Sequence, residues 1–506
     1  MKLTVKPYAM SGSVNNYMVI HPSTATQLDL DPGSLVQIEQ KHQGFQIITS
    51  NFIEQDVAGI SPEIIENLNL EVGANLHFKP TGVEGVTRII RKKMKKNSLE
   101  KEEVRIFMEA IERGLLTDGH IGAFGTAVEI NGMSSDETTY VAESILEFSK
   151  KLVHDSSTKV VDKHSIGGIA GNRITPLMIP IIAAANLTIP KVSTRAITSP
   201  AGTADALEVV MPVELTLSEA QEVIAKTGAC MVDGLRIGLG STADKFLRVV
   251  KQIKIDPQEM MIASILAKKK AAGSQHVLID LPTGPGSKLP TREDARKLAF
   301  RFASIGNKLG LKIESVISPG DQPIGTMIGP SLEITEALQI LQQDGGAHSL
   351  RRKALSLSGL ILEMAGKTER GNGYDLAKSI LNSGKAYEKF KEIAVAQGST
   401  MDNISWKEVP EASYTHTIKS EGGDKVYAVN SFNIGLMARA AGAPSDHLAG
   451  VVLHVDRGAV VEEGDPLITI HASSENKIDQ AIGIMRTAQP LVMERAILEH
   501  IPSVVE

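Results

Sequence analysis

Hydrophobic and polar positions follow different patterns along the chain, and the changes of pattern divide it into parts. Within residues 1–84, short runs such as 35–38 and 45–48 alternate polar and apolar positions between prolines and glycines, which is typical of short strands. Apolar residues then recur at helical spacing to about residue 151, and again between residues 241 and 273. We therefore expect these two stretches to form one discontinuous helical domain.

The remaining stretches alternate strand and helix patterns. After a short strand at residues 160–161, a glycine-rich turn leads to a helix that starts at Thr175, and further strands are expected at residues 190–192 and 276–281. Such alternation is typical of α/β proteins. Near the C-terminus, the pattern of residues 450–470 predicts short strands and tight turns, and it resembles the barrel-sandwich fold of biotin and lipoyl carriers. The modifiable lysine of those carriers is absent, so a carrier role is not expected.

The expected fold class is α/β. It combines a mixed-sheet α/β domain, a discontinuous helical domain, a small β-rich N-terminal module and a barrel-sandwich-like C-terminal segment. No repeat of fixed period is expected. The expected boundaries are residues 1–84 for the N-terminal module, 85–157 and 241–272 for the helical domain, 158–240 and 273–410 for the α/β phosphate-binding domain, and 411–506 for the C-terminal segment.

Composition narrows the possible classes of protein. Hydrophobic residues make up 42% of the 506 residues but aromatic residues only 4%, which favours helices packed on a parallel sheet over an aromatic-rich β-sandwich. The single cysteine, Cys230, excludes an intramolecular disulfide and an all-cysteine metal site, and it fits a reducing cytosol. A net charge of −6 gives no general reason to bind nucleic acid. Neither a signal peptide nor a membrane span is expected, so the predicted location is cytoplasmic.

One basic run, residues 88–96, has two interpretations. It could bind nucleic acid or another anion, or it could be the solvated start of a helix or a linker. No aromatic residues are interleaved with the basic ones, so the second interpretation is preferred.

The first stretch that carries candidate chemistry is residues 162–173, which read Asp-Lys-His-Ser-Ile-Gly-Gly-Ile-Ala-Gly-Asn-Arg. Its glycines allow close backbone approach to a ligand, and the helix that follows favours an anion at its N-terminus. Lys163 adds a cation and Ser165 a hydroxyl. The stretch lacks the P-loop ending and the dinucleotide glycine spacing, so neither an NTPase nor a Rossmann cofactor site is expected. A plain strand-to-helix turn remains the alternative.

The second stretch, residues 193–208, also follows a predicted strand. It contains four hydroxyl side chains and Arg195, which are followed by a Gly-Thr turn at residues 202–203. By itself it could be a capped helix start. Ligands of open α/β sheets bind at the carboxyl ends of strands, so two donor-rich loops of this kind predict a phosphate site.

These two stretches carry a resemblance to a known family. The Lys-His-Ser-x-Gly-Gly loop at 163–168 and the Ser-x-Arg-x-Ile-x-x-x-x-Gly-Thr-x-Asp-x-Leu-Glu loop at 193–208 resemble the two signatures of the thymidine and pyrimidine-nucleoside phosphorylases. The resemblance covers about residues 88–490. The N-terminal module and the stretches 255–257 and 284–288 are more similar to the archaeal AMP phosphorylase branch.

The resemblance implies a glycosyl-transfer reaction. Inorganic phosphate attacks the anomeric carbon of a nucleoside or nucleotide and expels the base. In the AMP branch the products are the free base and ribose 1,5-bisphosphate, with CMP and UMP as further substrates. Fixed donors that hold an anionic nucleophile and an acid that protonates the leaving base suit this chemistry.

The resemblance also implies roles for particular residues. Asp256 matches the proton donor to the base, although an Asp-Pro pair is also a common helix cap. His164 is expected to be a structural histidine that contacts phosphate. Phosphate-binding positions are Lys163, Ser165 and Ser193, and nucleotide-binding positions are Gly168, Thr194, Arg195, Ala196, Ile197, Thr198, Ser199, Thr203, Ser264 and Lys288.

Lys268 is a further possible site residue. It lies four residues after Ser264, so both side chains share one helix face, and both bind the base in the thymidine branch. The alternative is that Lys268 is one of three consecutive surface lysines.

Three functions stay open at this point: a nucleoside-5′-monophosphate phosphorylase, a pyrimidine nucleoside phosphorylase and a non-catalytic nucleotide-binding protein. Lys288 favours the first, because a 5′-phosphate needs a cation that a nucleoside does not. Inorganic phosphate is the expected co-substrate, and no metal or organic cofactor is expected. The other expected partner is a second copy of the chain, in a homodimer or a larger homo-oligomer.

Overall fold

The computed structural model describes residues 2–9, 16–39, 41–81, 84–196, 199–422 and 424–494. The chain divides into two compact units, one of residues 1–150 with 240–268 and one of residues 151–239 with 269–506. Within the described residues, no helix has the length and apolar character that crossing a bilayer requires.

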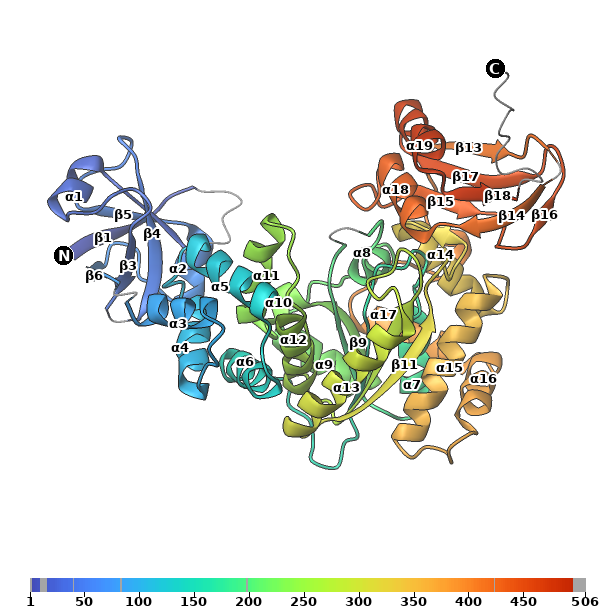
Figure 1. Ribbon diagram of the computed structural model, residues 1–506, viewed down its shortest axis with the longest axis horizontal. Coiled ribbons are helices and arrows are strands. Elements are labelled where there is room, and N and C mark those ends of the chain that lie inside the picture. The colour runs from blue at the N-terminus through green and yellow to red at the C-terminus, as the bar shows by residue number, and fades with distance from the viewer. Residues whose placement is uncertain are drawn as a thin grey trace, which may run out of the picture. The chain divides into compact units, whose positions relative to one another are not determined.

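The first unit begins with a closed six-stranded barrel, drawn in dark blue in Figure 1. Its strand order is β1-β5-β2-β4-β3-β6, and Leu3, Met18 and Phe45 are among the residues buried inside. The barrel contains β1 (Lys2–Pro7), β2 (Tyr17–Ile20), α1 (Pro22–Gln27), β3 (Leu35–Ile38), β4 (Gln43–Thr49), β5 (Val57–Ile60), α2 (Pro62–Asn67) and β6 (Asn75–Pro80).

The barrel is an internal repeat, so the expectation of no fixed-period repeat is wrong. Strands β1 and β5 pair in parallel, as do β4 and β2, so each half repeats the pairings of the other. Asp29 and Asn69 follow the two short helices with positive φ of 52° and 48°. Residues 40 positions apart match at Ile20 and Ile60, Pro22 and Pro62, Leu28 and Leu68, Leu30 and Leu70, and Gly33 and Gly73.

The rest of the first unit is helical and comes from two separated stretches of the chain. Phe107 stacks on Phe124 with ring centroids 3.9 Å apart, and Phe246 meets Phe124 edge-on, so the later stretch packs into the earlier one. This confirms the discontinuous helical domain. The helices are α3 (Glu84–Met94), α4 (Lys101–Glu112), α5 (Asp118–Asn131), α6 (Ser135–Phe148), α11 (Ser241–Gln252) and the first part of α12 (Gln258–Ala271).

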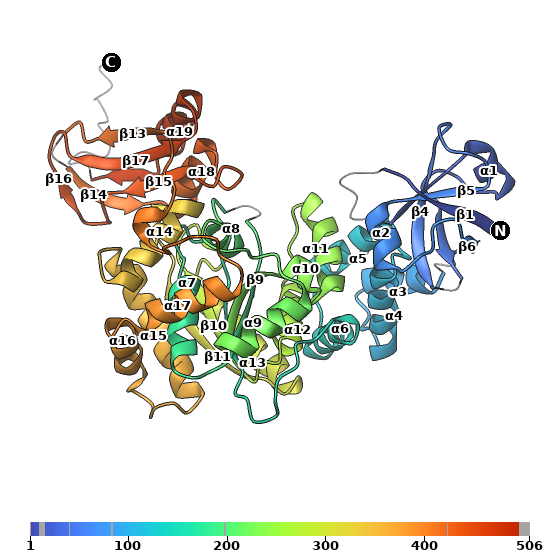
Figure 2. The same ribbon diagram turned by 180° about the vertical axis from the view of Figure 1, so that it is seen from behind.

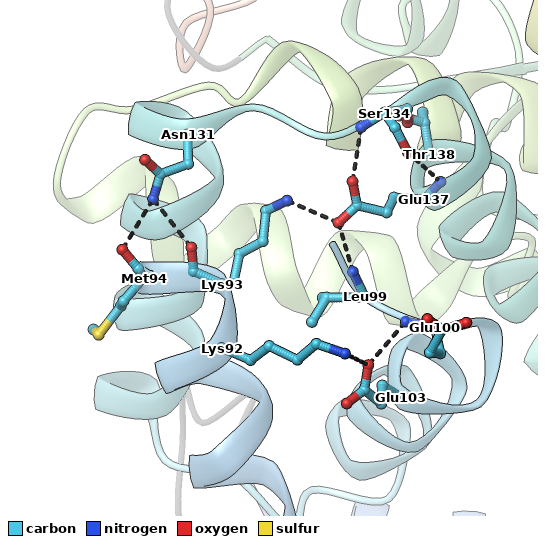
Figure 3. A network of polar contacts seen from close by, with 10 residues as sticks. All are labelled: Lys92, Lys93, Met94, Leu99, Glu100, Glu103, Asn131, Ser134, Glu137 and Thr138. Carbon is cyan, nitrogen blue, oxygen red and sulfur yellow. Dashed lines mark hydrogen bonds and ion pairs between the residues drawn. The ribbon is translucent and has the colours of Figure 1, made fainter. Parts of the chain in front are cut away.

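The basic run 88–96 belongs largely to α3 and is tied into this bundle, as Figure 3 shows. The Nζ atom of Lys93 lies 2.8 Å from Oε1 of Glu137, and both side chains are buried. Lys92 pairs with Glu103 at 2.7 Å. The run is therefore helical, but it forms the second half of α3 rather than the start of a helix, and its two central lysines are ion-paired within the unit rather than solvated.

The second unit contains the α/β part. Its parallel strands follow the order β11-β10-β7, and β8 pairs in parallel with β9; a parallel bridge from Val160 to Thr188 links the two groups. The strands are β7 (Val161–Ser165), β8 (Ile189–Ser193), β9 (Ala229–Asp233), β10 (His276–Thr283) and β11 (Lys312–Pro319).

Helices cover this sheet. Helix α13 packs on β10 and β11, and α15 packs on β10. Both Figure 1 and Figure 2 show α15 and α16 side by side next to α7, which is apolar all round and buried as such a helix should be. The helices are α7 (Thr175–Ala184), α8 (Thr203–Glu208), α9 (Leu217–Thr227), α10 (Gly234–Ile237), α13 (Arg292–Lys308), α14 (Pro330–Gln342), α15 (His348–Met364), α16 (Gly373–Asn382) and α17 (Lys385–Ala396).

The C-terminal segment adds two antiparallel sheets, of order β12-β15-β17-β13 and β16-β14-β18. The α/β fold class is therefore confirmed. The expected mixed sheet is not found in the α/β part, because the pairs among β7 to β11 are parallel. Within the second unit, the antiparallel pairs belong to the two C-terminal sheets. The two sheets and the two helices beside them comprise β12 (Met327–Ile328), which comes from the preceding part of the chain, and β13 (Tyr414–Lys419), β14 (Asp424–Val429), α18 (Ser431–Ala441), β15 (Gly450–Leu453), β16 (Val460–Val461), β17 (Pro466–Ala472), α19 (Glu475–Ala488) and β18 (Leu491–Met493).

Candidate active site

The first predicted loop starts only after Ser165, because the strand before it is longer than the sequence suggests. Lys163, His164 and Ser165 are the last residues of β7 rather than part of the turn. Lys163 and Ser165 are two residues apart, so their side chains leave the same face of the sheet. Ser165 lies directly opposite Asp280 of β10 in the parallel register.

Asp280 is fully buried, and its carboxylate is contacted by two hydroxyl donors and one ammonium group. Its Oδ2 accepts a hydrogen bond from Oγ of Ser165 at 2.6 Å, and its Oδ1 accepts one from Oγ of Ser318 at 2.6 Å. The ammonium of Lys353, on α15, lies 2.9 Å from Oδ2. Burial raises the pKa of the Asp280 carboxyl, but the charges of Lys353 and Lys163 and the two hydroxyls outweigh burial and bring that pKa below its ordinary value. Asp280 is therefore a carboxylate.

Lys163 is buried next to this carboxylate. Burial lowers the pKa of its ammonium to about 7, and the nearby charges of Lys353, Lys269 and Arg173 act in the same direction against the attraction of Asp280. An anion that arrives beside Lys163 would favour the charged form of its side chain.

A second buried ion pair lies nearby. The Nζ atom of Lys269 is 2.7 Å from Oδ2 of the buried Asp162. Lys191 is buried as well, and burial lowers the pKa of its ammonium well below the ordinary value. Together with Lys163 and Lys353, the described residues place four largely buried lysines around two buried aspartates. Because lysines outnumber carboxylates, the base of the loop suits an anion.

The glycine loop that follows β7 is held by its backbone. Gly171 has a φ of +64°, and a Cβ atom there would lie 2.8 Å from the carbonyl oxygen of Gly325. The N–H of Ala170 donates to Oγ of Ser431, at the start of α18, at 2.9 Å. Gly168 is exposed with a φ of +110°, and a Cβ atom there would lie 4.0 Å from Cγ of Lys288. The loop tip and the exposed Lys288 are therefore neighbours.

Arg173, at the end of the same loop, bridges to the second loop. Its Nη1 donates to Oγ1 of Thr203 at 2.8 Å, and its Nη2 donates to the carbonyl of Ala201 at 2.9 Å. Its Nε pairs with the buried carboxylate of Glu333. The two predicted phosphate loops are thus joined by one buried guanidinium.

The second loop is shaped by carboxylates. Oδ2 of Asp205 accepts the N–H groups of Ala196 and Gly202, each at 2.7 Å, and so ties the two ends of the loop together. The guanidinium of Arg195 pairs with Glu208 at 2.5 Å and with Glu214 at 2.7 Å. Its charge is therefore taken up within the protein.

The remaining predicted residues of the second loop differ in exposure. Ser193 is 8% exposed, and its Oγ has no hydrogen-bond partner within the described part of the chain. Thr194 is exposed, and Ser199 donates from Oγ to the carbonyl of Ala201 at 3.0 Å. Two further predicted positions, Ile197 and Thr198, lie outside the described residues.

Three predicted residues belong to the first unit. Asp256 is exposed and lies two residues before α12, and Ser264 is buried on that helix. The ammonium of Lys268 lies 2.5 Å from Oδ1 of Asp244, and its side chain is 18% exposed. Lys268 is therefore a largely buried lysine that is ion-paired on its own unit.

Sequence reasoning missed Asp280, Ser318 and Lys353. Each is a single polar residue within a strand or helix pattern, so no local motif marks it. The described residues contain no group of three or more His, Cys, Asp or Glu side chains in a metal-binding arrangement.

Comparison with known proteins agrees with this architecture. A family profile described as "Glycosyl transferase family, helical bundle domain" matches residues 87–149, and one described as "Glycosyl transferase family, a/b domain" matches residues 157–387. The "Pyrimidine nucleoside phosphorylase C-terminal domain" profile matches residues 425–491.

Several relatives match nearly the whole chain. The AMP phosphorylase of Pyrococcus furiosus is 40% identical over 490 residues, which are 96% of this chain and 97% of the relative. The AMP phosphorylase of Pyrococcus horikoshii is 42% identical over 98% of both chains. The chain belongs to the glycosyl transferase family of these relatives.

The fold of this family extends to a more distant solved structure. The anthranilate phosphoribosyltransferase of Thermus thermophilus is similar to this chain with a TM-score of 0.53 and 18% sequence identity. The match covers 61% of this chain and 99% of the other. This similarity confirms that the matched part of the chain has the fold of that transferase.

Proposed function

We propose that this chain cleaves AMP by phosphorolysis, with CMP and UMP as further substrates. An oxygen of inorganic phosphate forms a bond to C1′ of the ribose while the bond from C1′ to the base nitrogen breaks. The electron pair of that bond leaves with the base, which takes up a proton. The products are the free base and ribose 1,5-bisphosphate.

One observation carries the choice of a nucleotide over a nucleoside. The tip of the glycine loop at Gly168 lies beside Lys288, while the buried lysines lie at the base of the same loop. Two separate cationic positions suit two phosphates, one from the co-substrate and one from the 5′ position of the nucleotide. The names of the relatives support the same choice.

We assign the orthophosphate to the buried end of this site. Lys163 supplies the cation, and Ser165, Ser193 and Thr203 supply hydroxyls. The buried Oγ of Ser193 supports this assignment, because a buried hydroxyl without a partner in the described chain is costly unless a ligand satisfies it. His164 lies between Lys163 and Ser165 in β7, is half-buried and is assigned a structural contact.

We assign the nucleotide to the loop tips, with Lys288 on the 5′-phosphate. Arg195 contributes as a positioning residue, because its ion pairs with Glu208 and Glu214 hold the loop. On the resemblance, Asp256 gives the proton to the leaving base, and Ser264 and Lys268 contact the base. The other nucleotide-binding positions are Gly168, Thr194, Ala196, Ile197, Thr198, Ser199 and Thr203.

The proposal includes no metal and no organic cofactor. It places the enzyme in the cytoplasm as a homodimer or larger homo-oligomer, without a nucleic-acid or membrane partner. The net charge of −6 and the single cysteine support this setting.

Identification of the products tests the proposal. The purified chain is incubated with AMP and phosphate, and ³¹P NMR spectroscopy follows the phosphorus species. Ribose 1,5-bisphosphate has two phosphorus signals, one from the anomeric position and one from the 5′ position. Release of adenine together with both signals, and only in the presence of phosphate, is the expected result. Adenine release that yields ribose 5-phosphate would show hydrolysis and overturn the proposal.

A further inference from the structure

The buried carboxylate of Asp280 determines how Ser165 can bond. Asp280 lies opposite Ser165 across the paired strands β10 and β7, and its own carbonyl accepts the N–H of Ile166 at 2.9 Å. Main chain and side chain therefore hold the two residues in one register. The O–O distance of 2.6 Å between Ser165 and Asp280 lies in the range of a hydroxyl that donates to a charged carboxylate.

The direction of this hydrogen bond follows from the chemistry of both groups. An ionised carboxylate can only accept, so Ser165 must be the donor. A hydroxyl has one hydrogen, and that of Ser165 is committed to Asp280. What Ser165 can offer to a ligand is a lone pair.

Thr203 is arranged in the opposite sense. Its Oγ1 accepts a hydrogen bond from Arg173, because a guanidinium can only donate. The hydrogen of the Thr203 hydroxyl is therefore left to donate elsewhere. The two predicted phosphate loops thus present one accepting hydroxyl and one donating hydroxyl.

We propose that Asp280 is a positioning residue that makes Ser165 accept a hydrogen bond from the P–OH group of hydrogen phosphate, and that this contact selects phosphate over sulfate. The inference rests on the proposed function. Near neutral pH, hydrogen phosphate carries one hydroxyl and bare oxygens, whereas sulfate carries no hydrogen. Phosphate therefore satisfies both Ser165 and Thr203, and sulfate leaves the lone pair of Ser165 facing an anionic oxygen.

This arrangement also affects the reaction. When Ser165 holds the protonated oxygen, the ionised oxygens remain for the other contacts and for attack on C1′. The hydroxyl of the phosphate, which is its poorest nucleophile, is thus the oxygen occupied by Ser165.

Isothermal titration of the full-length protein with sodium phosphate and with sodium sulfate measures the preference without any turnover. We expect sulfate to bind at least about tenfold more weakly than phosphate, which is the factor that 1.4 kcal/mol represents. Effects that change the binding of all anions equally cancel in the ratio of the two dissociation constants. Sodium arsenate, which is protonated as phosphate is, should bind as phosphate does.

Variants then locate the origin of the preference. In Asp280→Asn the side-chain amide can donate to Ser165, so the hydroxyl hydrogen of Ser165 becomes free to donate to a ligand. In Ser165→Ala the hydroxyl that accepts from the ligand is absent. In both variants, the dissociation constants for sulfate and phosphate should differ by no more than about threefold, which corresponds to a difference in binding free energy of less than 1.4 kcal/mol. Ser318→Ala is the matched control, because it removes a hydroxyl from the same carboxylate but leaves Ser165 bonded, and its ratio should stay at the wild-type value.

The outcomes separate the two proposals. Equal binding of sulfate and phosphate by the wild type, or a ratio that Ser165→Ala leaves unchanged, would overturn the role of Asp280. If Asp280→Asn does not fold, the ratio measured for Ser165→Ala alone decides whether the proposal stands. A phosphate preference without AMP cleavage would overturn the proposed function and leave the phosphate-selective site standing.

Discussion

Nη1 of Arg173 donates a hydrogen bond to Oγ1 of Thr203 at 2.8 Å, and this contact joins the two loops that the sequence marks as phosphate-binding. The same guanidinium holds the carbonyl of Ala201 and the buried carboxylate of Glu333. Because Arg173 is itself buried, the loops depend on a group inside the protein rather than on the ligand for their relative position.

Replacement of this link should destabilise the second unit. Arg173→Ala leaves the buried Glu333 without its partner, and loss of one member of a buried pair costs about 3–5 kcal/mol. Chemical denaturation monitored by circular dichroism should show a lower free energy of unfolding. Arg370→Ala is the control, because it removes an exposed ion pair with Glu314 and should leave the transition unchanged. An Arg173→Ala protein as stable as the wild type would contradict the structural role.

The affinity for phosphate should depend on the charge of Lys163. Burial brings the pKa of its ammonium from the ordinary value of 10.5 to about 7, so the side chain is charged below this pH and neutral above it. Binding of an anion favours the charged form, so phosphate affinity should fall as the pH rises above about 7, with proton uptake on binding.

Titration calorimetry in two buffers of different ionisation enthalpy measures this proton uptake. The ionisation of phosphate itself falls in the same pH range, so the comparison is with Lys163→Met in identical buffers. That variant should bind phosphate more weakly and lose the part of the pH dependence that belongs to the lysine. The same pH profile in both proteins would remove Lys163 from the phosphate site.

Asp256→Asn should slow turnover by a factor of about 10²–10⁴, the usual contribution of a positioned general acid. The KM values for AMP and phosphate should change little, because Asp256 is assigned to the leaving base. A nucleotide whose base is already quaternised needs no proton to leave, so its cleavage should be nearly insensitive to the substitution. Steady-state kinetics with both substrates provide the comparison, and equal loss with both would argue for a purely structural role.

Lys288→Ala should lower kcat/KM for AMP by about 10- to 150-fold, because one charge-assisted contact contributes about 1.5–3 kcal/mol. Lys288→Arg keeps the charge and should retain most of the activity. The rate of adenosine cleavage should not change, because adenosine has no 5′-phosphate. An AMP efficiency that survives Lys288→Ala would place the 5′-phosphate elsewhere.

Much of the architecture follows from local sequence patterns. The strand that ends in Ser193 and the helix that begins at Thr175 were predictable because short apolar runs, a proline in the first helical turn and glycine-rich turns act over a few residues. The discontinuous helical domain also follows from periodicity, and the Phe124 contacts show how its two stretches meet.

The parts that sequence reasoning missed depend on distant residues. Lys353 reaches Asp280 from a helix about 70 residues later in the chain, and no spacing rule connects the two. The extension of β7 to Ser165 is fixed by pairing with β10 rather than by local propensity. The barrel repeat escaped notice because its two halves share only scattered positions, among them Pro22 and Pro62.

The central claim is that the substrate carries a 5′-phosphate. The most direct measurement is kcat/KM for AMP, adenosine and thymidine under identical phosphate concentrations, with base release followed by chromatography. The account predicts a strong preference for AMP over both nucleosides, since only AMP offers a phosphate to Lys288. Cleavage of thymidine or adenosine at a rate above that of AMP would contradict it.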